Sequence, residues 1–292
     1  MRILVTNDDG VHAPGLGALV RALARWASGT HDVVVVAPLA NYSGAAAAVG
    51  TVYERQTISY RRVTITDAPV PTYGVDATPA LSVLVGSLGG FGPRPDIVVS
   101  GINLGVNVGR SVLHSGTIGA ALTGAQLGLR GLAVSLRSGS PPEEWSTAAD
   151  LAVALVPALC AAPPRTVLNL NVPSLRFTQL RGVRRARIST SGIVKSAASG
   201  SPDHGEGGPA KGGDPDEGEV RLTLGAAVPT LGPVDETESP EDDAALIAAG
   251  FASLTPLVGV REDTEPGSDE VVRAGLAALN KLVGPRSDTT AR

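Results

Sequence analysis

The sequence predicts an α/β fold with a doubly wound, mostly parallel sheet, followed by a C-terminal β-hairpin region. Two features predict the parallel sheet: short apolar runs without polar interruptions, and helical patterns that separate them. A strand that is buried on both faces of a sheet is apolar throughout, as residues 33–37 are within the predicted strand at 32–37. The chain has 292 residues, of which 43% are hydrophobic, and this is enough for one large core with an appendage.

The first predicted strand covers residues 3–6 and ends in a loop that contains Gly10 and Pro14. Apolar residues at helical spacing, from Leu16 to Trp26, then predict a helix. Further along we expect strands at residues 32–37, 96–100, 132–136 and 166–171, helices at residues 78–88, 116–127 and 145–159, and short β-segments within residues 51–75. Such an alternation is typical of a doubly wound sheet.

The pattern changes after residue 180. Residues 181–190 and 219–224 alternate apolar and polar side chains, which predicts the two arms of a long antiparallel hairpin. Its connection, residues 197–218, is rich in Gly, Pro, Ser and acidic residues, so we expect a disordered or mobile tip. The remaining predicted elements are a helix at residues 241–249, a strand at residues 251–256 and an amphipathic helix at residues 269–282.

Composition and charge exclude several classes of protein. The net charge of −4 leaves no basic field, which argues against a nucleic-acid binder but not against a small phosphorylated substrate. Cys160 is the only cysteine, so an intramolecular disulfide is excluded and a reducing compartment fits. Because polar residues interrupt the N-terminal apolar run and no other run is long enough to cross a bilayer, we expect a cytoplasmic protein without membrane contacts.

Two adjacent acidic residues, Asp8 and Asp9, follow the first predicted strand directly. Open α/β sheets bind ligands at this carboxyl edge. Adjacent carboxylates repel each other and lose hydration if the loop packs down, and a divalent cation is the simplest compensation. The alternative interpretation is a simple turn, since Asn, Asp and Gly are the ordinary turn residues.

Three further polar segments are expected at the same edge: residues 37–44 and 100–107, which follow strands, and residues 114–121, which begin a helix. If the sheet is as predicted, Asp8, Asp9, Ser43 and Asn103 offer only oxygen ligands. Carboxylate, hydroxyl and amide oxygens suit Mg²⁺ or Mn²⁺, and no Cys/His cluster suits zinc. The sequence therefore predicts a hard divalent cation that binds a substrate phosphate.

The helix that begins near Ser115, Gly116 and Thr117 offers free amide groups and the positive end of its dipole, which predicts an anion site. The alternative is plain N-capping by Ser115. His12 and His114 are secondary candidates for proton transfer or substrate contact. Neither the dinucleotide fingerprint nor the P-loop of ATPases occurs in the sequence.

Four segments carry a resemblance to a known family: residues 5–16, VTNDDGVHAPGL; 37–44, APLANYSG; 99–109, VSGINLGVNVG; and 115–121, SGTIGAA. In this order they resemble the SurE survival proteins, which are metal-dependent 5′/3′-nucleotidases of stationary-phase bacteria. The resemblance continues through residues 167–173 and 250–257, so it covers most of the chain. It implies a Rossmann-like catalytic core over residues 1–180 and an oligomerisation region over residues 181–292. It also implies hydrolysis of nucleoside 5′-monophosphates to nucleoside and phosphate, with 3′-monophosphates as second candidate substrates.

The resemblance also implies roles for individual residues. Asp8 and Asp9 are the implied catalytic residues and, with Ser43 and Asn103, the implied ligands of one divalent cation, Mg²⁺ or Mn²⁺. The implied phosphate-binding residues are Gly44, Asn107, Ser115, Gly116 and Thr117. A homodimer or homotetramer is implied, built with the hairpin and an exchanged C-terminal segment.

Three departures from the family pattern concern substrate preference and oligomer contacts rather than the metal positions. Tyr42 replaces a basic or amide residue, His114 replaces a tyrosine, and residues 241–243 read Glu-Asp-Asp where Gly-Thr-Asp is usual.

Three alternatives stay open on the sequence. A haloacid-dehalogenase-like phosphatase needs two Asp separated by one residue, and the adjacent acids disfavour it. A non-catalytic nucleotide or sugar-phosphate binding module would use the same loops without releasing phosphate. The acidic hairpin could also serve as an arm that docks a partner.

Overall fold

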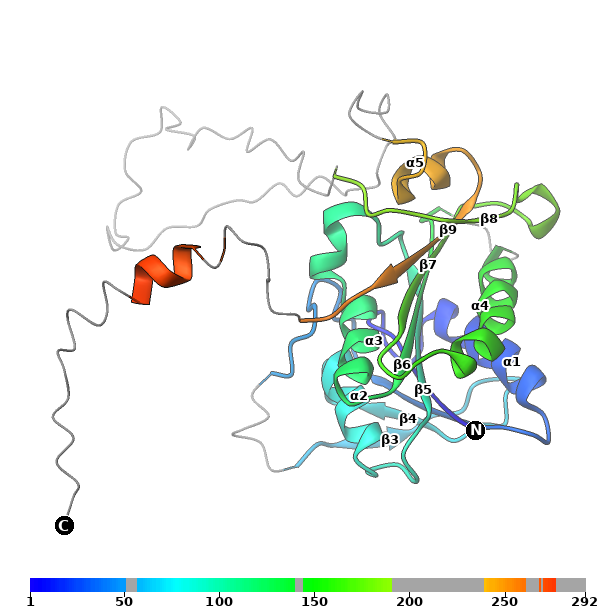
Figure 1. The fold of residues 1–292 in the computed structure, drawn as a ribbon. Coiled ribbons are helices and arrows are strands. Elements are labelled where there is room, and N and C mark those ends of the chain that lie inside the picture. Colours follow the sequence, from blue (N-terminus) through cyan, green and yellow to red (C-terminus); the bar gives the residue numbers. More distant parts are fainter. Residues whose placement is uncertain (51–56, 140–143, 191–238, 261–267, 269, 277–292) are drawn as a thin grey trace, which may run out of the picture. The chain divides into compact units, whose positions relative to one another are not determined.

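A nine-stranded sheet organises the described part of the chain, which comprises residues 1–50, 57–139, 144–190, 239–260, 268 and 270–276 of a computed structural model (Figure 1). The chain divides into two units, Met1–Leu257 and Val258–Arg292. The sheet and all the elements named below belong to the first unit. In the second unit, residues 268 and 270–276 are helical.

The sheet is mostly parallel and its strand order is β3-β4-β2-β1-β5-β6-β7-β9-β8. The strands are β1 (Arg2–Thr6), β2 (Asp32–Pro38), β3 (Tyr60–Arg62), β4 (Thr72–Val75), β5 (Ile97–Leu104), β6 (Arg130–Leu136), β7 (Val167–Val172), β8 (Val183–Arg185) and β9 (Ala252–Leu257). The central strands from β4 to β7 are parallel, whereas β3 and β9 run antiparallel to β4 and β7, and β8 runs parallel to β9. Because the chain passes from β1 to β2 on one side while β5 lies on the other, the strand order reverses between β1 and β5, where such folds form a ligand crevice.

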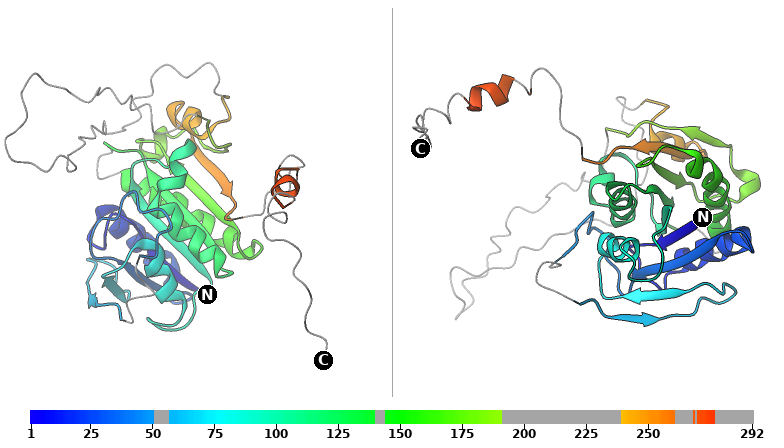
Figure 2. Two further views of the ribbon diagram at one scale, coloured as in Figure 1. Left: turned by 90° about the vertical axis from the view of Figure 1, so that its left-hand side faces the viewer. Right: turned by 60° about the horizontal axis from the view of Figure 1, so that its bottom comes forward.

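Helices cover both faces of the sheet (Figure 2). The helices are α1 (Pro14–Ala27), α2 (Pro79–Ser87), α3 (Gly116–Gln126), α4 (Glu144–Ala161) and α5 (Asp243–Ala248), with 3₁₀ turns η1 (Gly109–His114) and η2 (Phe177–Gln179). On one face α1 packs against α4, and on the other α2 packs against α3. This arrangement explains why the parallel strands are apolar on both sides.

The helix α1 shows how the sequence determines this packing. Its residues Leu16, Leu19 and Leu23 recur at helical spacing and are fully buried against the sheet. Each such side chain contributes about 1.5–3 kcal/mol by burial. The helix begins so close to β5 that a Cβ on Gly15 would lie 2.1 Å from the carbonyl oxygen of Ile102, so only glycine fits there.

Most predicted elements of the core are confirmed, including the cap of α2, where the Thr78 hydroxyl accepts a hydrogen bond of 3.2 Å from the Leu81 amide. The strand β5 is longer than residues 96–100, because a register shift against β6 between Ser100 and Asn103 lets pairing continue to Leu104. Cys160 is free, half-buried and packed against the main core.

The hairpin region is only partly described. Its first arm contains β8, which pairs with β9. The second arm (219–224) and the tip (197–218) lie outside the described residues, as does most of the helix expected at 269–282, so these stay predictions. The division of the chain at residue 180 also stays a prediction.

Among the described residues, α4 alone has the length and apolar composition that a membrane-spanning helix needs. It packs against α1, β5 and β6, and core helices commonly meet the same two criteria.

Candidate metal and phosphate site

Asp8 is the point where three segments of the chain meet. Its carboxylate is 3% exposed and accepts hydrogen bonds from the Thr117 hydroxyl (Oδ1–Oγ1 2.6 Å) and the Thr117 amide (Oδ2–N 3.0 Å). Its backbone oxygen accepts a hydrogen bond of 2.7 Å from the Tyr42 amide. The end of β1, the loop after β2 and the start of α3 are therefore joined at this one residue.

Gly116 lets α3 approach Asp8. A Cβ at this position would lie 2.8 Å from the Asp8 Cβ and 2.9 Å from its Oδ2, closer than real Cβ atoms come. The sequence assigned Gly116 to phosphate binding, and the structure shows a packing requirement in addition.

Asp9 connects the loop after β1 to the end of β5. It is half-buried, and its Oδ2 accepts a hydrogen bond of 3.0 Å from the Leu104 amide. Asn103, the preceding residue, donates from Nδ2 to the Gly105 carbonyl oxygen at 2.6 Å, and in the described chain nothing donates to its Oδ1. The amide oxygen of Asn103 is thus an acceptor without a protein partner at the edge that carries Asp9.

Ser43 lies in an exposed loop that is fixed at both ends. The Tyr42 amide ties one end to Asp8, and the Ala46 amide ties the other to the carbonyl oxygen of His114, at 3.2 Å. Within the loop, the Ser43 amide donates to Asn41 Oδ1 at 2.7 Å, as in an Asx turn. Gly44 follows with φ +85° and open space around it.

The two carboxylates carry buried negative charge without a cationic side chain. Burial raises the pKa of Asp8, and the hydrogen bonds from Thr117 offset part of this rise. Burial raises the pKa of Asp9 to about 6, and the neighbouring Asp8 charge adds to the shift. Within the described ranges, no Lys, Arg or His forms an ion pair with either residue.

This donor set fits a hard divalent cation. Carboxylate, hydroxyl and amide oxygens are the donors that Mg²⁺ and Mn²⁺ prefer, and a cation would compensate the paired negative charges. The part of the chain that the structure describes contains no group of three or more His, Cys, Asp or Glu side chains that could hold a metal ion, so the candidate set depends on Ser43 and Asn103 beside the two carboxylates.

Ser115 is the N-cap of α3. Its hydroxyl accepts a hydrogen bond of 3.2 Å from the Ile118 amide, so the N-capping interpretation of this segment is confirmed. The amide and hydroxyl of Thr117 are bonded to Asp8, which leaves the first turn of α3 directed at the carboxylate pair. The Gly116 amide also faces Asp8 and the Ile118 amide is bonded to Ser115, so the amides of this turn serve Asp8 and the helix cap in this structure.

Asn107 is held by two neighbouring strands that the sequence had not connected with it. Its amide donates to Asn171 Oδ1 at 2.7 Å, and its carbonyl oxygen accepts from Asn169 Nδ2 at 2.9 Å and from Asn171 Nδ2 at 3.1 Å. Its side-chain Nδ2 donates to Ser135 Oγ at 2.8 Å. The available signal was the pair of asparagines at alternate positions of an otherwise apolar strand, since a buried amide needs a partner.

The two secondary histidine candidates lie at the edges of this region. His12 is exposed and lines a cavity of about 170 Å³ between the start of α1 and residues 63–65, together with Arg21. His114 is exposed at the end of η1.

Comparison with known proteins supports the resemblance found in the sequence. A family model described as "Survival protein SurE" matches residues 3–195. The 5′/3′-nucleotidases SurE of Escherichia fergusonii and of Escherichia coli O157:H7 are each 38% identical over 259 residues, which is 88% of this chain and 90% of theirs. The crystal structure of the SurE protein from Aquifex aeolicus superposes with a TM-score of 0.62 at 26% identity, over 97% of this chain and 100% of that one.

Proposed function

The chain belongs to the SurE family and is a nucleotidase, and we propose that it cleaves nucleoside 5′-monophosphates, with 3′-monophosphates as second substrates, using one Mg²⁺ or Mn²⁺ ion. The proposed ligands are Asp8, Asp9, Ser43 and Asn103, and the proposed phosphate-binding residues are Gly44, Asn107, Ser115, Gly116 and Thr117. One observation supports this best: neither the buried Asp8, bonded to the first turn of α3, nor the half-buried Asp9, bonded to the end of β5, has a cationic partner among the described residues.

In the mechanism that this arrangement favours, a bound divalent cation supplies positive charge to the phosphate oxygens as charge develops during displacement. The positive end of the α3 dipole, at the turn that contacts Asp8, would orient the remaining phosphate oxygens. Asp8 is fixed by Thr117 at both carboxylate oxygens.

Asp9 is the better placed of the two acids to take a proton from water. It is more exposed than Asp8, and Leu104 is the only described donor to its carboxylate, at Oδ2. Burial raises its pKa to about 6 in the metal-free chain, and a bound cation would lower this value and keep the carboxylate ionised.

The test is a phosphate-release panel over nucleoside monophosphates with EDTA, Mg²⁺ or Mn²⁺. We expect release with either metal and none with EDTA, and a loss of about 10³-fold in kcat for Asp8→Asn with the fold retained, since an acid at the reacting centre contributes on this scale. Full activity in EDTA, or wild-type turnover by Asp8→Asn, would contradict the proposed site. Substrate binding without phosphate release under all conditions would instead favour a non-catalytic binding module.

Assembly and location are proposed from the resemblance and from the composition. We propose a homodimer or homotetramer in the cytoplasm, without nucleic-acid or membrane partners, on the basis of the resemblance and the net charge of −4. Among the described strands, β8 is at one edge of the sheet, and an edge strand can pair with another chain. Light scattering on the full chain measures the oligomeric state directly.

A further inference from the structure

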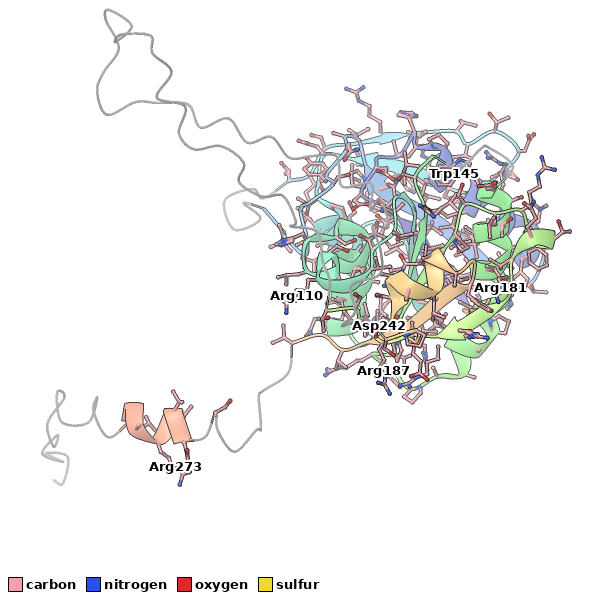
Figure 3. All side chains as sticks on the ribbon, turned by 90° about the horizontal axis from the view of Figure 1, so that it is seen from above. Arg110, Trp145, Arg181, Arg187, Asp242 and Arg273 are labelled. Atoms are coloured by element: carbon pink, nitrogen blue, oxygen red, sulfur yellow. The ribbon has the colours of Figure 1, made fainter. Side chains whose placement is uncertain are left out.

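Asp243 is a buried carboxylate that lies outside the proposed metal site. It is the first residue of α5 and has no exposed surface. Three amides donate to it: Gly109 to both oxygens (3.2 Å to Oδ1 and 3.0 Å to Oδ2), Ser189 to Oδ1 at 3.0 Å and Ala244 to Oδ1 at 2.8 Å. Figure 3 shows the surroundings, with Asp242 at the start of α5 and Arg187 on the neighbouring segment.

The burial of the Asp243 carboxylate is unfavourable for its charged form. Burial without a cation raises the pKa of Asp243, and the amide donors, with Gly109 the strongest, offset part of the rise. No ion pair with Asp243 occurs among the residues that the structure describes. The Asp243 carboxylate therefore connects backbone segments by hydrogen bonds, with Gly109 and Ser189 on two of them.

The hydrogen bond from Gly109 to Asp243 fixes the start of η1, the segment that leads into α3. Gly109 begins η1 with φ +56°, in the left-handed region that favours glycine. At the other end of η1, His114 accepts a hydrogen bond from Ala46, and Thr117 is bonded to Asp8 shortly afterwards. The start of η1 is thus held by the C-terminal part of the chain, whereas its end is held by the proposed metal site.

We propose that Asp243 is a positioning residue for phosphate hydrolysis: by holding Gly109 it fixes η1 and thereby the first turn of α3 against Asp8 and the substrate phosphate. This inference rests on the proposed function, because it assumes that the first turn of α3 meets the phosphate. Small displacements of positioning groups cost activity, up to about 10²-fold for 1 Å.

The test compares Asp243→Asn with Asp242→Asn in the full chain, using kcat and KM for a nucleoside monophosphate and the Kd of Mn²⁺. Asn at position 243 keeps Oδ1 for Ser189, Ala244 and the longer bond from Gly109 (3.2 Å), but it places an NH₂ group where Oδ2 accepts from Gly109 at 3.0 Å. We expect kcat to fall about 10-fold, with KM and the Mn²⁺ Kd changed less than about 2-fold. Asp242 is the matched control, since its carboxylate accepts from Ser239 (2.9 Å) and does not touch η1, so Asp242→Asn should keep wild-type kcat.

Amide hydrogen exchange supplies a readout that is independent of activity. Exchange at Gly109 and through η1 should be faster in Asp243→Asn and unchanged in Asp242→Asn. Wild-type kcat in a folded Asp243→Asn variant, or an equal loss of Mn²⁺ affinity and kcat, would overturn the inference. An inactive wild-type chain would contradict the proposed function instead. Failure of the positioning role and failure of the proposed function can therefore be told apart.

Discussion

Gly116 is a residue of the proposed site at which a larger side chain does not fit. Replacing it by Ala places a Cβ 2.8 Å from the Asp8 Cβ, so either α3 or Asp8 must move. We expect Gly116→Ala to lower the free energy of unfolding by about 1–3 kcal/mol through overpacking, and to lower kcat at least 10-fold. Urea denaturation and the phosphate-release assay measure the two effects.

Gly17 gives the matched control for this change. It also lies early in a helix, and a Cβ there would meet only the end of the flexible Arg21 side chain, at 3.1 Å. We expect Gly17→Ala to be neutral or to stabilise the chain by about 0.5–1 kcal/mol, because alanine is the better helix former. Equal effects of the two substitutions would contradict the close approach of α3 to Asp8.

At the scale of single elements, the sequence was most informative where one pattern dominated. The fully apolar run that became β2 and the helical spacing in α1 were each predicted from local sequence. The hydrogen bonds that hold Asn107 were not predicted, because they depend on the register between β6 and β7 and on a loop that returns to these strands. The short β8 could not be bounded from alternation alone, since its pairing is with β9, far along the chain.

Substitutions in β7 test how much the hydrogen bonds of Asn107 with Asn169 and Asn171 stabilise this loop. Asn171→Ala removes the acceptor of the buried Asn107 amide, and an unpaired buried donor costs about 1–3 kcal/mol. Ser253, opposite Asn171 in β9, has a buried hydroxyl without a hydrogen-bond partner, so Ser253→Ala should cost less than about 0.5 kcal/mol. Urea denaturation of both variants decides the point, and similar losses would show that the hydrogen bonds to Asn107 contribute little.

At the scale of the whole molecule, the free energy of unfolding depends on the protonation of the proposed site and on metal binding there. The pKa of Asp9 is about 6 in the folded chain against an ordinary value of 3.8, and that of Asp8 is also raised. Between these values the folded chain binds more protons than the unfolded chain. The free energy of unfolding of the metal-free protein therefore falls as pH rises through this window, and the contribution of Asp9 is lost as the pH passes through about 6.

A bound divalent cation should reverse that loss, because it replaces the protons as the compensating charge on Asp8 and Asp9. We expect Mn²⁺ to raise Tm more at about pH 7.5 than at about pH 5, with about 2.7 kcal/mol of stabilisation at a hundredfold excess over Kd. Thermal unfolding with EDTA or Mn²⁺ at the two pH values measures this, and Asp242→Asn should respond as the wild type does. In Asp9→Asn the metal response and its pH dependence should both be lost. A response that is equal at both pH values, or that persists in Asp9→Asn, would show that the metal binds elsewhere on the chain.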